Sequence, residues 1–228
     1  MITLQILLDT ANLEDIRRLN DLYPVKGVTT NPTILAGEKA ESWLDLLKRI
    51  NDILSSEQLL FAQVTASNCE DMVKEAGFLV ENIREDLYIK IPVIPEGIKA
   101  IKKLNRMGIN TAATAVFSTQ QALIAANAGA DFIAPYVNRL DNIEADGISV
   151  VRDIVKMFKI HNIKSKIIAA SFRNVNQIKE CCLAGADTAT VSTELYEKAS
   201  AHPLTYQAVE QFDSDWKSLY GDKLMYQY

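Results

Sequence analysis

The chain has 228 residues, of which 48% are hydrophobic and 23% charged, and a formal net charge of −5 at pH 7. This composition suits a globular protein with a sizeable core. The mild acidity, with 24 Lys and Arg residues spread along the chain, argues against a nucleic-acid partner and against attachment to an anionic membrane surface. No apolar run approaches the roughly 20 residues needed to span a bilayer.

The N-terminal segment, MITLQILLDT, has no basic region before its apolar run, so we expect a first strand and no signal peptide. The three cysteines, Cys69, Cys181 and Cys182, have no C-x-x-C spacing, which favours a cytoplasmic protein with reduced thiols. His161 and His202 show no metal-ligand spacing, and neither a P-loop nor a GxGxxG motif occurs. The sequence therefore predicts no metal site and no cofactor.

Short β-prone runs alternate with helical patterns along the whole chain. The predicted strands are 4–9, 27–31, 59–65, 87–93, 110–116, 132–137, 166–171 and 188–192. Most are continuous apolar runs without strict alternation, which is typical of parallel strands covered on both faces. Eight strand–helix units favour a single domain, residues 1–228, closed into a (β/α)8 TIM barrel, over a doubly wound sheet.

Several predicted helices have recognisable first turns. Asn12 precedes an apolar stripe, and Ser67 and Ser118 each stand three residues before Glu or Gln, as in a capping box. Pro95 suits the first turn of the helix that follows the fourth strand, because that turn does not need its missing N–H. Glycines 108, 129 and 185 fall where helices are expected to end.

An extra C-terminal helix is predicted over residues 203–220. Its apolar residues, Leu204, Val209, Phe212, Trp216 and Leu219, lie roughly along one face. Such a stripe needs burial, either against its own barrel or against a neighbouring subunit.

The carboxyl ends of the predicted strands are polar. They carry Asp9, Thr29, Asn31, Gln63, Lys90, Thr114, Tyr136, Asn138, Arg139, Ser171 and Ser192. Active sites of TIM barrels lie at this end of the strands. Polar groups within apolar runs are costly unless they are hydrogen-bonded, so we expect these side chains to converge on one pocket.

Lys90 interrupts the apolar run LYIKIPV. A buried ammonium loses solvation, which lowers the pKa of the lysine. The neutral amine is a nucleophile that condenses with a ketone to give a Schiff base. The alternative is a structural lysine paired with Asp9 or another carboxylate.

Schiff-base chemistry needs a proton shuttle, and the phenol of Tyr136 can serve. Gln63 and Thr114, on the strands that flank Lys90, are expected to hold a water between Lys90 and Tyr136. In the alternative, all three are ordinary polar residues at the edge of the barrel core.

A phosphate site is predicted from Arg139 and Ser171, because a guanidinium binds phosphate in bidentate fashion and a hydroxyl adds a donor. The alternative for Arg139 is an ion pair with Asp131 or Asp141. Asp9 and Asn31 are then available for hydroxyl groups of a sugar-like substrate.

Six motifs resemble the transaldolase family, and most closely its short-chain, fructose-6-phosphate aldolase-type branch. They are GVTTNPTIL (27–35), FAQV (61–64), YIKIPV (88–93), TAVF (114–117), APYVNRLD (134–141) and AASFR (169–173). The resemblance implies a TIM barrel, a metal-free class I aldolase mechanism and Lys90 as the Schiff-base lysine. It assigns Asp9, Asn31, Gln63, Thr114 and Tyr136 as helpers and places Arg139 and Ser171 around the phosphate. With Thr29 from the strand ends, we expect Asp9, Asn31, Arg139 and Ser171 to bind a small phosphorylated sugar.

Within this family, Gln63 and Tyr136 match the aldolase-type branch, since true transaldolases typically carry Glu and Phe there. The implied reaction is reversible cleavage of fructose 6-phosphate to the hydroxyketone dihydroxyacetone and glyceraldehyde 3-phosphate. A transaldolase of the pentose phosphate pathway, and a phosphosugar-binding barrel without turnover, are the alternatives. The sequence departs from the aldolase-type branch at two places. Phe117 stands where relatives often have Tyr, and the tail 221–228 runs past their usual end. The resemblance also implies a homo-oligomer, a pentamer or decamer whose subunits exchange the C-terminal helix.

Overall fold

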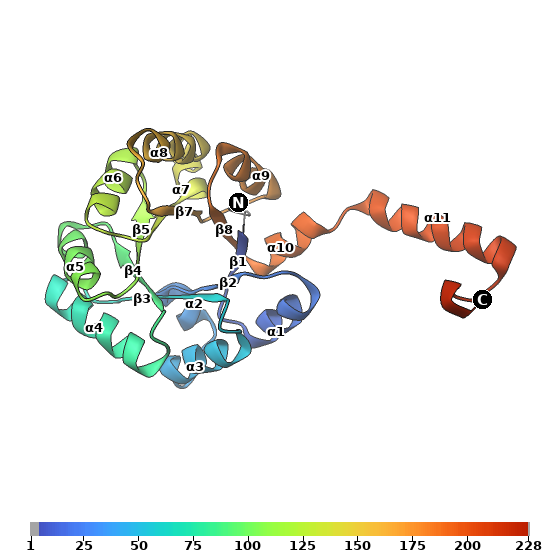
Figure 1. Ribbon diagram of the computed structural model, residues 1–228, viewed down its shortest axis with the longest axis horizontal. Helices are drawn as coiled ribbons and strands as arrows, with labels where there is room; N and C mark the ends of the chain where they lie inside the picture. The colour runs from blue at the N-terminus through green and yellow to red at the C-terminus, as the bar shows by residue number, and fades with distance from the viewer. Residues whose placement is uncertain (1–4, 228) are drawn as a thin grey trace.

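Eight parallel strands close into a barrel in which each strand pairs with the next and β8 returns to β1 (Figure 1). The computed structural model describes residues 5–227. The strands are β1 Gln5–Asp9, β2 Gly27–Thr29, β3 Leu59–Gln63, β4 Tyr88–Pro92, β5 Thr111–Val116, β6 Phe132–Pro135, β7 Lys166–Ala169 and β8 Thr188–Val191. The predicted (β/α)8 barrel is therefore confirmed, with all eight strands in their predicted places.

Most strands end one or two residues earlier than predicted. Gln63, for example, is the last residue of β3, and Tyr136 follows β6 and forms only an isolated bridge to Ala170. Residue 4 of the first predicted strand lies outside the described residues.

Helices separate and follow the strands. They are α1 Leu13–Leu22, α2 Pro32–Gly37, α3 Trp43–Ile53, α4 Cys69–Asn82, α5 Pro95–Arg106, α6 Thr119–Asn127, α7 Val137–Asp141, α8 Gly147–His161, α9 Val175–Ala184, α10 Thr193–Ser200 and α11 Pro203–Tyr220. The short helices α2 and α7 stand at the ends of β2 and β6, so they bring additional side chains to the carboxyl end of the barrel.

The predicted helix caps are confirmed at Asn12 and Ser118, whose side chains accept from backbone N–H groups of α1 and α6. Pro95 lies in the first turn of α5, and Gly185 ends α9 in the left-handed region. The Ser67 cap is wrong. Asn68 caps α4 instead and accepts from Asp71 N, because the helix begins one residue later than the Ser-x-x-Glu pattern requires.

Strand alternation divides the interior into two cores. Leu7 faces the barrel axis and Leu8 faces the helices, and the same alternation separates Phe132 from Ile133. The larger core fills the space between strands and helices, whereas the smaller one lies inside the barrel.

Three aromatic rings fill the barrel toward the amino ends of the strands. The ring centroids of Phe61 and Tyr88 are 4.8 Å apart, and Phe132 meets them edge-on at 5.3 and 5.0 Å. These separations suit favourable aromatic packing. The rings close this end of the barrel, so the open space lies above them, toward the carboxyl ends.

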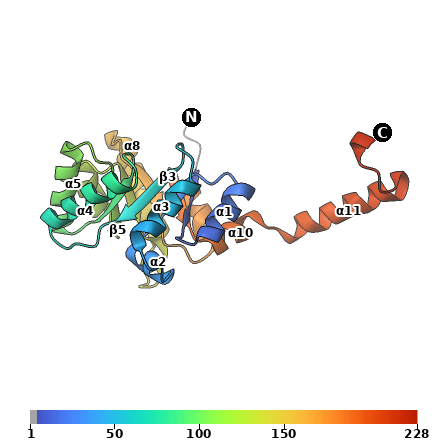
Figure 2. The ribbon, with the colours of Figure 1, turned by 90° about the horizontal axis from the view of Figure 1, so that it is seen from below.

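The predicted C-terminal helix is present as α11, but it leaves the barrel. After α10, which still contacts β1, α11 projects outward in both views (Figures 1 and 2). Its apolar side chains are exposed, with Phe212 68% and Leu219 73% accessible. Among the described residues, no helix has both the length and the apolar character required to cross a membrane.

Candidate active site

A cavity of about 110 Å³ opens among the carboxyl ends of the strands. Three small inward-facing side chains, Ala112, Ala134 and Ala170, leave this space unfilled, and Phe61 and Ile168 also line it. The remaining lining residues are Asp9, Thr29, Asn31, Lys90, Thr114, Tyr136, Arg139, Ser171 and Thr190. The cavity thus brings together eight of the eleven strand-end residues expected to converge, and Gln63, Asn138 and Ser192 do not line it.

Lys90 is 6% exposed, and its Nζ donates to the Thr30 carbonyl oxygen at 2.8 Å. Among the described residues, it forms no ion pair. Burial lowers the pKa of the Lys90 ammonium, and the nearby charge of Asp9 opposes that shift in part. Since no carboxylate pairs with it, the structural alternative for Lys90 loses its main support.

Asp9 is held by a chain of hydroxyl groups. Thr29 Oγ1 donates to Asp9 Oδ1 at 2.7 Å and lies 2.5 Å from Thr190 Oγ1. Because Thr29 has one hydroxyl proton and gives it to the carboxylate, Thr190 must be the donor to Thr29. Thr190 was not among the predicted site residues, although the alternation of strand 188–192 could have indicated that it faces inward.

Asn31 begins α2 as its N-cap. Its Oδ1 accepts from Ile34 N at 3.0 Å, which orients the side chain. Among the described residues, its Nδ2 group has no hydrogen-bond partner, so a donor remains at the edge of the cavity. Ser192, by contrast, is not part of the lining and caps α10 through Leu195 N.

Tyr136 presents its phenol beside Thr114, with the two side-chain oxygens 3.1 Å apart. The ring meets Phe117 edge-on at 5.6 Å between centroids, and Arg139 Cζ lies 5.2 Å from its centre. A phenol held in this way can donate or accept a proton in the cavity that contains Lys90.

A bulge in β5 produces this arrangement. Ala115 has φ of 56°, and the register with β6 shifts between Ala113 and Val116. The extra residue reverses the alternation, so Val116 joins the outer core and Phe117 reaches Tyr136. Thr114 still faces inward, just before the bulge.

The predicted anion-binding residues, Arg139 on α7 and Ser171 after β7, both line the cavity, and we call this part of it the anion end. Ser171 has φ of 62°, and its carbonyl oxygen accepts from Asn138 N at 2.8 Å. Neither carboxylate suggested for an ion pair contacts Arg139. Asp131 accepts from Thr111 N at 2.8 Å, and Asp141 accepts from Gly147 N at 2.9 Å.

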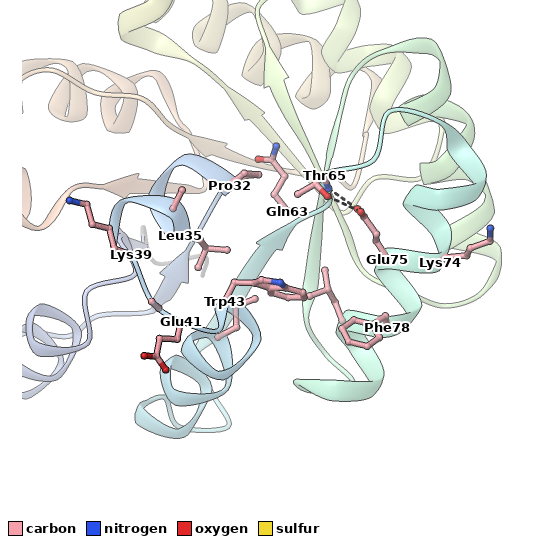
Figure 3. Close-up of a pocket in the computed structure, with 14 residues that line it drawn as sticks. Pro32, Leu35, Lys39, Glu41, Trp43, Gln63, Thr65, Lys74, Glu75 and Phe78 are labelled. Atoms are coloured by element: carbon pink, nitrogen blue, oxygen red, sulfur yellow. Dashed lines mark hydrogen bonds between the residues drawn. The ribbon is translucent and has the colours of Figure 1, made fainter.

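Gln63 departs from the expected arrangement. It pairs in register with Lys90 and lies two residues after the inward-facing Phe61, so it is on the inner side of its strand. It does not line the smaller cavity, however, and borders a neighbouring groove of about 650 Å³, with its amide pointing away from Trp43 and Phe78 (Figure 3). That groove lies between α2, α3 and α4, and the exposed rings of Trp43 and Phe78 form its apolar wall. At its edge, Glu75 accepts from Thr65 N at 2.6 Å. The structure therefore brings Thr114 and Tyr136 together but not Gln63.

Potential metal ligands are dispersed in the part of the chain that the structure describes, with no group of three or more His, Cys, Asp or Glu side chains gathered as a site. The hydrogen-bonding and charged groups of the cavity are instead a lysine, hydroxyls, an amide, a carboxylate and a guanidinium. This set suits a small, polyhydroxylated, anionic ligand with a group that an amine can attack.

Comparison with known proteins gives consistent matches. The model of the transaldolase/fructose-6-phosphate aldolase family matches residues 6–223. A "probable transaldolase" of Agathobacter rectalis is 40% identical over 219 residues, covering 96% of this chain and all of that protein. One of Brachyspira hyodysenteriae is 38% identical over 218 residues, with the same coverage.

A solved structure of a flavocytochrome b2 double variant with sulfite bound matches with a TM-score of 0.60 and 12% identity. The match covers 83% of this chain and 56% of that one, so this chain spans little more than half of the larger protein. At this identity the similarity concerns the barrel fold alone.

Proposed function

Because the chain belongs to the transaldolase/fructose-6-phosphate aldolase family, we propose that it is a class I aldolase which reversibly cleaves fructose 6-phosphate. The products are dihydroxyacetone and glyceraldehyde 3-phosphate. Membership establishes an enzyme of the aldolase or transaldolase type. The choice of a lyase over a transferase rests on the residues that line the cavity.

The observation that carries the proposal is the phenol of Tyr136, hydrogen-bonded to Thr114 in the same cavity as Lys90. Release of a free ketone requires hydrolysis of the Schiff base, in which water is added and a proton is moved to nitrogen. A phenol and a hydroxyl can hold and polarise that water without adding a second charge beside the lysine.

The synthetic direction proceeds in four steps. The neutral amine of Lys90 attacks the ketone carbon of dihydroxyacetone, and the carbonyl oxygen leaves as water after it takes protons through Tyr136. The iminium then gives a carbon-bound proton back to Tyr136 and becomes an enamine. The enamine forms the new carbon–carbon bond with the aldehyde, whose oxygen takes a proton. Water finally cleaves the iminium, which frees the product and restores the amine.

Substrate binding follows from the charges in the cavity. Arg139 and Ser171 would bind the phosphate, and the alternative ion pairs of Arg139 are absent among the described residues. Thr29, Asp9 and Asn31 would accept from and donate to substrate hydroxyls. Asp9 would also stabilise the iminium that forms on Lys90.

A transaldolase is the second candidate, and the printed name of both relatives supports it. In that case the three-carbon unit passes from one sugar phosphate to another without release of the ketone. Gln63 does not line the cavity, so it favours neither reaction over the other. A binding protein without turnover is a poorer explanation, because binding alone does not require a buried amine.

Tyr136→Phe distinguishes the two enzymes. General acid–base assistance is typically worth about 10²–10⁴-fold, so cleavage of fructose 6-phosphate should fall within that range while transfer between sugar phosphates falls less. Coupled assays of both reactions measure this. Tyr88→Phe is the matched control, because Tyr88 faces the closed end of the barrel. A wild-type enzyme that transfers efficiently but neither uses nor releases dihydroxyacetone would establish the transaldolase.

A further inference from the structure

Gln177, near the start of α9, is a buried amide with an extended set of hydrogen bonds. It is 6% exposed and does not line the cavity. Its Nε2 donates to Asp141 Oδ2 at 2.6 Å and, more weakly, to Asn138 Oδ1 at 3.4 Å. Its Oε1 accepts from Arg173 N at 2.7 Å.

These bonds connect the two segments that carry the anion-binding pair. Asn138 and Asp141 lie on α7, on either side of Arg139. Arg173 lies two residues after Ser171. The link is reinforced by the backbone, since Asn138 N donates to Ser171 O at 2.8 Å.

The positions of Arg139 and Ser171 depend on this link, because local hydrogen bonds do little to fix α7 or the segment after β7. Helix α7 has five residues, too few for more than one turn of internal hydrogen bonds. Ser171 adopts a left-handed backbone conformation, which a serine does not favour without support from its surroundings. Loss of the amide would remove the Gln177 partner from the partly buried Asp141 Oδ2 and from the Arg173 N–H.

We propose that Gln177 is a positioning residue that holds Arg139 and Ser171 at the separation a phosphate requires. The inference rests on the proposed function for the identity of the substrate. It concerns only the phosphate end, so removal of Gln177 should weaken binding of the phosphorylated aldehyde and leave the chemistry at Lys90 intact.

The test uses Gln177→Leu and the control Gln58→Leu. Gln58 is also a buried amide, 9% exposed, whose side chain bonds Asn20, Val25 O and Ser55 N. It precedes β3, at the opposite end of the barrel from the cavity. The control therefore reproduces the loss of a buried, fully bonded glutamine without touching the anion end.

The measurement is the KM of glyceraldehyde 3-phosphate and of unphosphorylated glyceraldehyde, each condensed with dihydroxyacetone. Loss of a charge-assisted bond corresponds to about tenfold or more in affinity, so Gln177→Leu should raise the first KM by that factor. In Gln177→Leu, the KM of unphosphorylated glyceraldehyde and the kcat should change by less than about twofold. In Gln58→Leu, the ratio of the two KM values should equal that of wild type.

Gln177→Glu is the second variant, because it preserves shape and the acceptor for Arg173 N but sets a carboxylate against Asp141. It should show the same selective loss. Equal increases in both KM values, or a ratio that matches Gln58→Leu, would overturn the inference. So would a failure of both Gln177 variants to fold, since Gln177 would then be a structural residue.

Calorimetric titration with inorganic phosphate keeps this result separate from the proposed function. Both Gln177 variants should bind phosphate about tenfold more weakly than wild type and Gln58→Leu. If wild type shows no aldol turnover but phosphate binding follows this order, the positioning role stands and the reaction is wrong. If phosphate does not bind to wild type, the positioning role is wrong.

Discussion

At the scale of single residues, the decisive feature is a lysine that is buried without a carboxylate partner. The hydrogen bond from Lys90 Nζ to Thr30 O persists after the lysine loses its proton, because a neutral amine still has N–H donors. The amine therefore keeps its orientation in the nucleophilic form. Asp9 limits how far the pKa falls, through its charge, while Thr29 and Thr190 hold the carboxylate in place.

The first prediction concerns the covalent intermediate. Borohydride reduction in the presence of dihydroxyacetone should inactivate the enzyme and add the mass of the reduced ketone to the peptide that contains Lys90. Lys90→Met should take up no label, whereas Lys166→Met, at the opposite end of the barrel, should be labelled as wild type. Peptide mass spectrometry measures both. Since the iminium itself serves as electron sink, a chelator should leave turnover unchanged. Label on another lysine would refute the mechanism.

The second prediction is a pH dependence. Imine formation needs the neutral amine, so its rate should fall as pH drops through the Lys90 pKa, which lies below the ordinary value of 10.5. This fall is the acid limb of the pH profile. Asp9→Asn removes a charge that stabilises the ammonium, so the pKa should fall further and the acid limb should move to lower pH. The pH profile of borohydride trapping gives the position of the limb. Asp131→Asn, at the other end of the barrel, should not move it, and a limb that moves upward in Asp9→Asn would contradict the assignment.

At the scale of elements, the bulge in β5 decides which side chains meet in the cavity. An uninterrupted strand would turn Val116 inward and Phe117 outward. The bulge at Ala115 reverses this, so the Phe117 ring supports Tyr136. The left-handed conformation of Ala115 costs energy that a glycine would not incur.

The third prediction tests that element. Ala115→Val places a β-branched residue at positive φ and should destabilise the protein by about 1–3 kcal/mol. If the strand regains its regular alternation instead, Phe117 leaves Tyr136 and turnover falls. Ala115→Gly is the matched control and should keep both stability and turnover, because glycine adopts this conformation freely. Denaturant unfolding and the aldol assay measure the two effects. A valine variant as stable and active as wild type would mean that the bulge is not needed.

For the molecule as a whole, the notable element is α11, which extends away from the barrel (Figures 1 and 2). Leu204, Phe212 and Leu219 on this helix are exposed. The ring centroids of Trp216 and Tyr220 are 4.5 Å apart. The groove beside Gln63 is a second exposed apolar surface, with Trp43 50% and Phe78 44% accessible. Surfaces of this kind are typical of interfaces. We expect α11 to pack on a neighbouring subunit, and the predicted pentamer or decamer remains a prediction.

The fourth prediction concerns this assembly. A chain cut before residue 203 should have a much smaller mass in light scattering than the full chain. Phe212→Asp should also dissociate the oligomer, because it places a charge in the apolar stripe. Ser214→Asp, on the opposite face of α11, is the control and should leave the mass unchanged. A full-length protein that is monomeric at working concentration would exclude the exchange of this helix.

The alternation of strands and helices, the barrel and the bounds of α11 followed from local features of the sequence. Of the eleven polar residues at the strand ends, eight line the cavity, and Gln63, Asn138 and Ser192 do not. Apolar runs specify strands, capping residues specify helix starts, and parallel strands bring their carboxyl ends together whatever their detailed packing. One cap was misplaced by a single residue, because Ser67 and Asn68 are both good caps and only the packed helix chooses between them.

The tertiary structure alone decided which of these residues meet. Gln63 and Lys90 are neighbours in register, but Gln63 lines the groove beside α2, α3 and α4 and not the cavity that Lys90 lines. Thr190 reaches Asp9 through Thr29, from a strand more than 150 residues away along the chain and next to β1 in the closed barrel. The β5 bulge and the Gln177 network likewise depend on neighbours distant in sequence. Their geometry is set by close packing and by the need to pair every buried polar group, which no local pattern encodes.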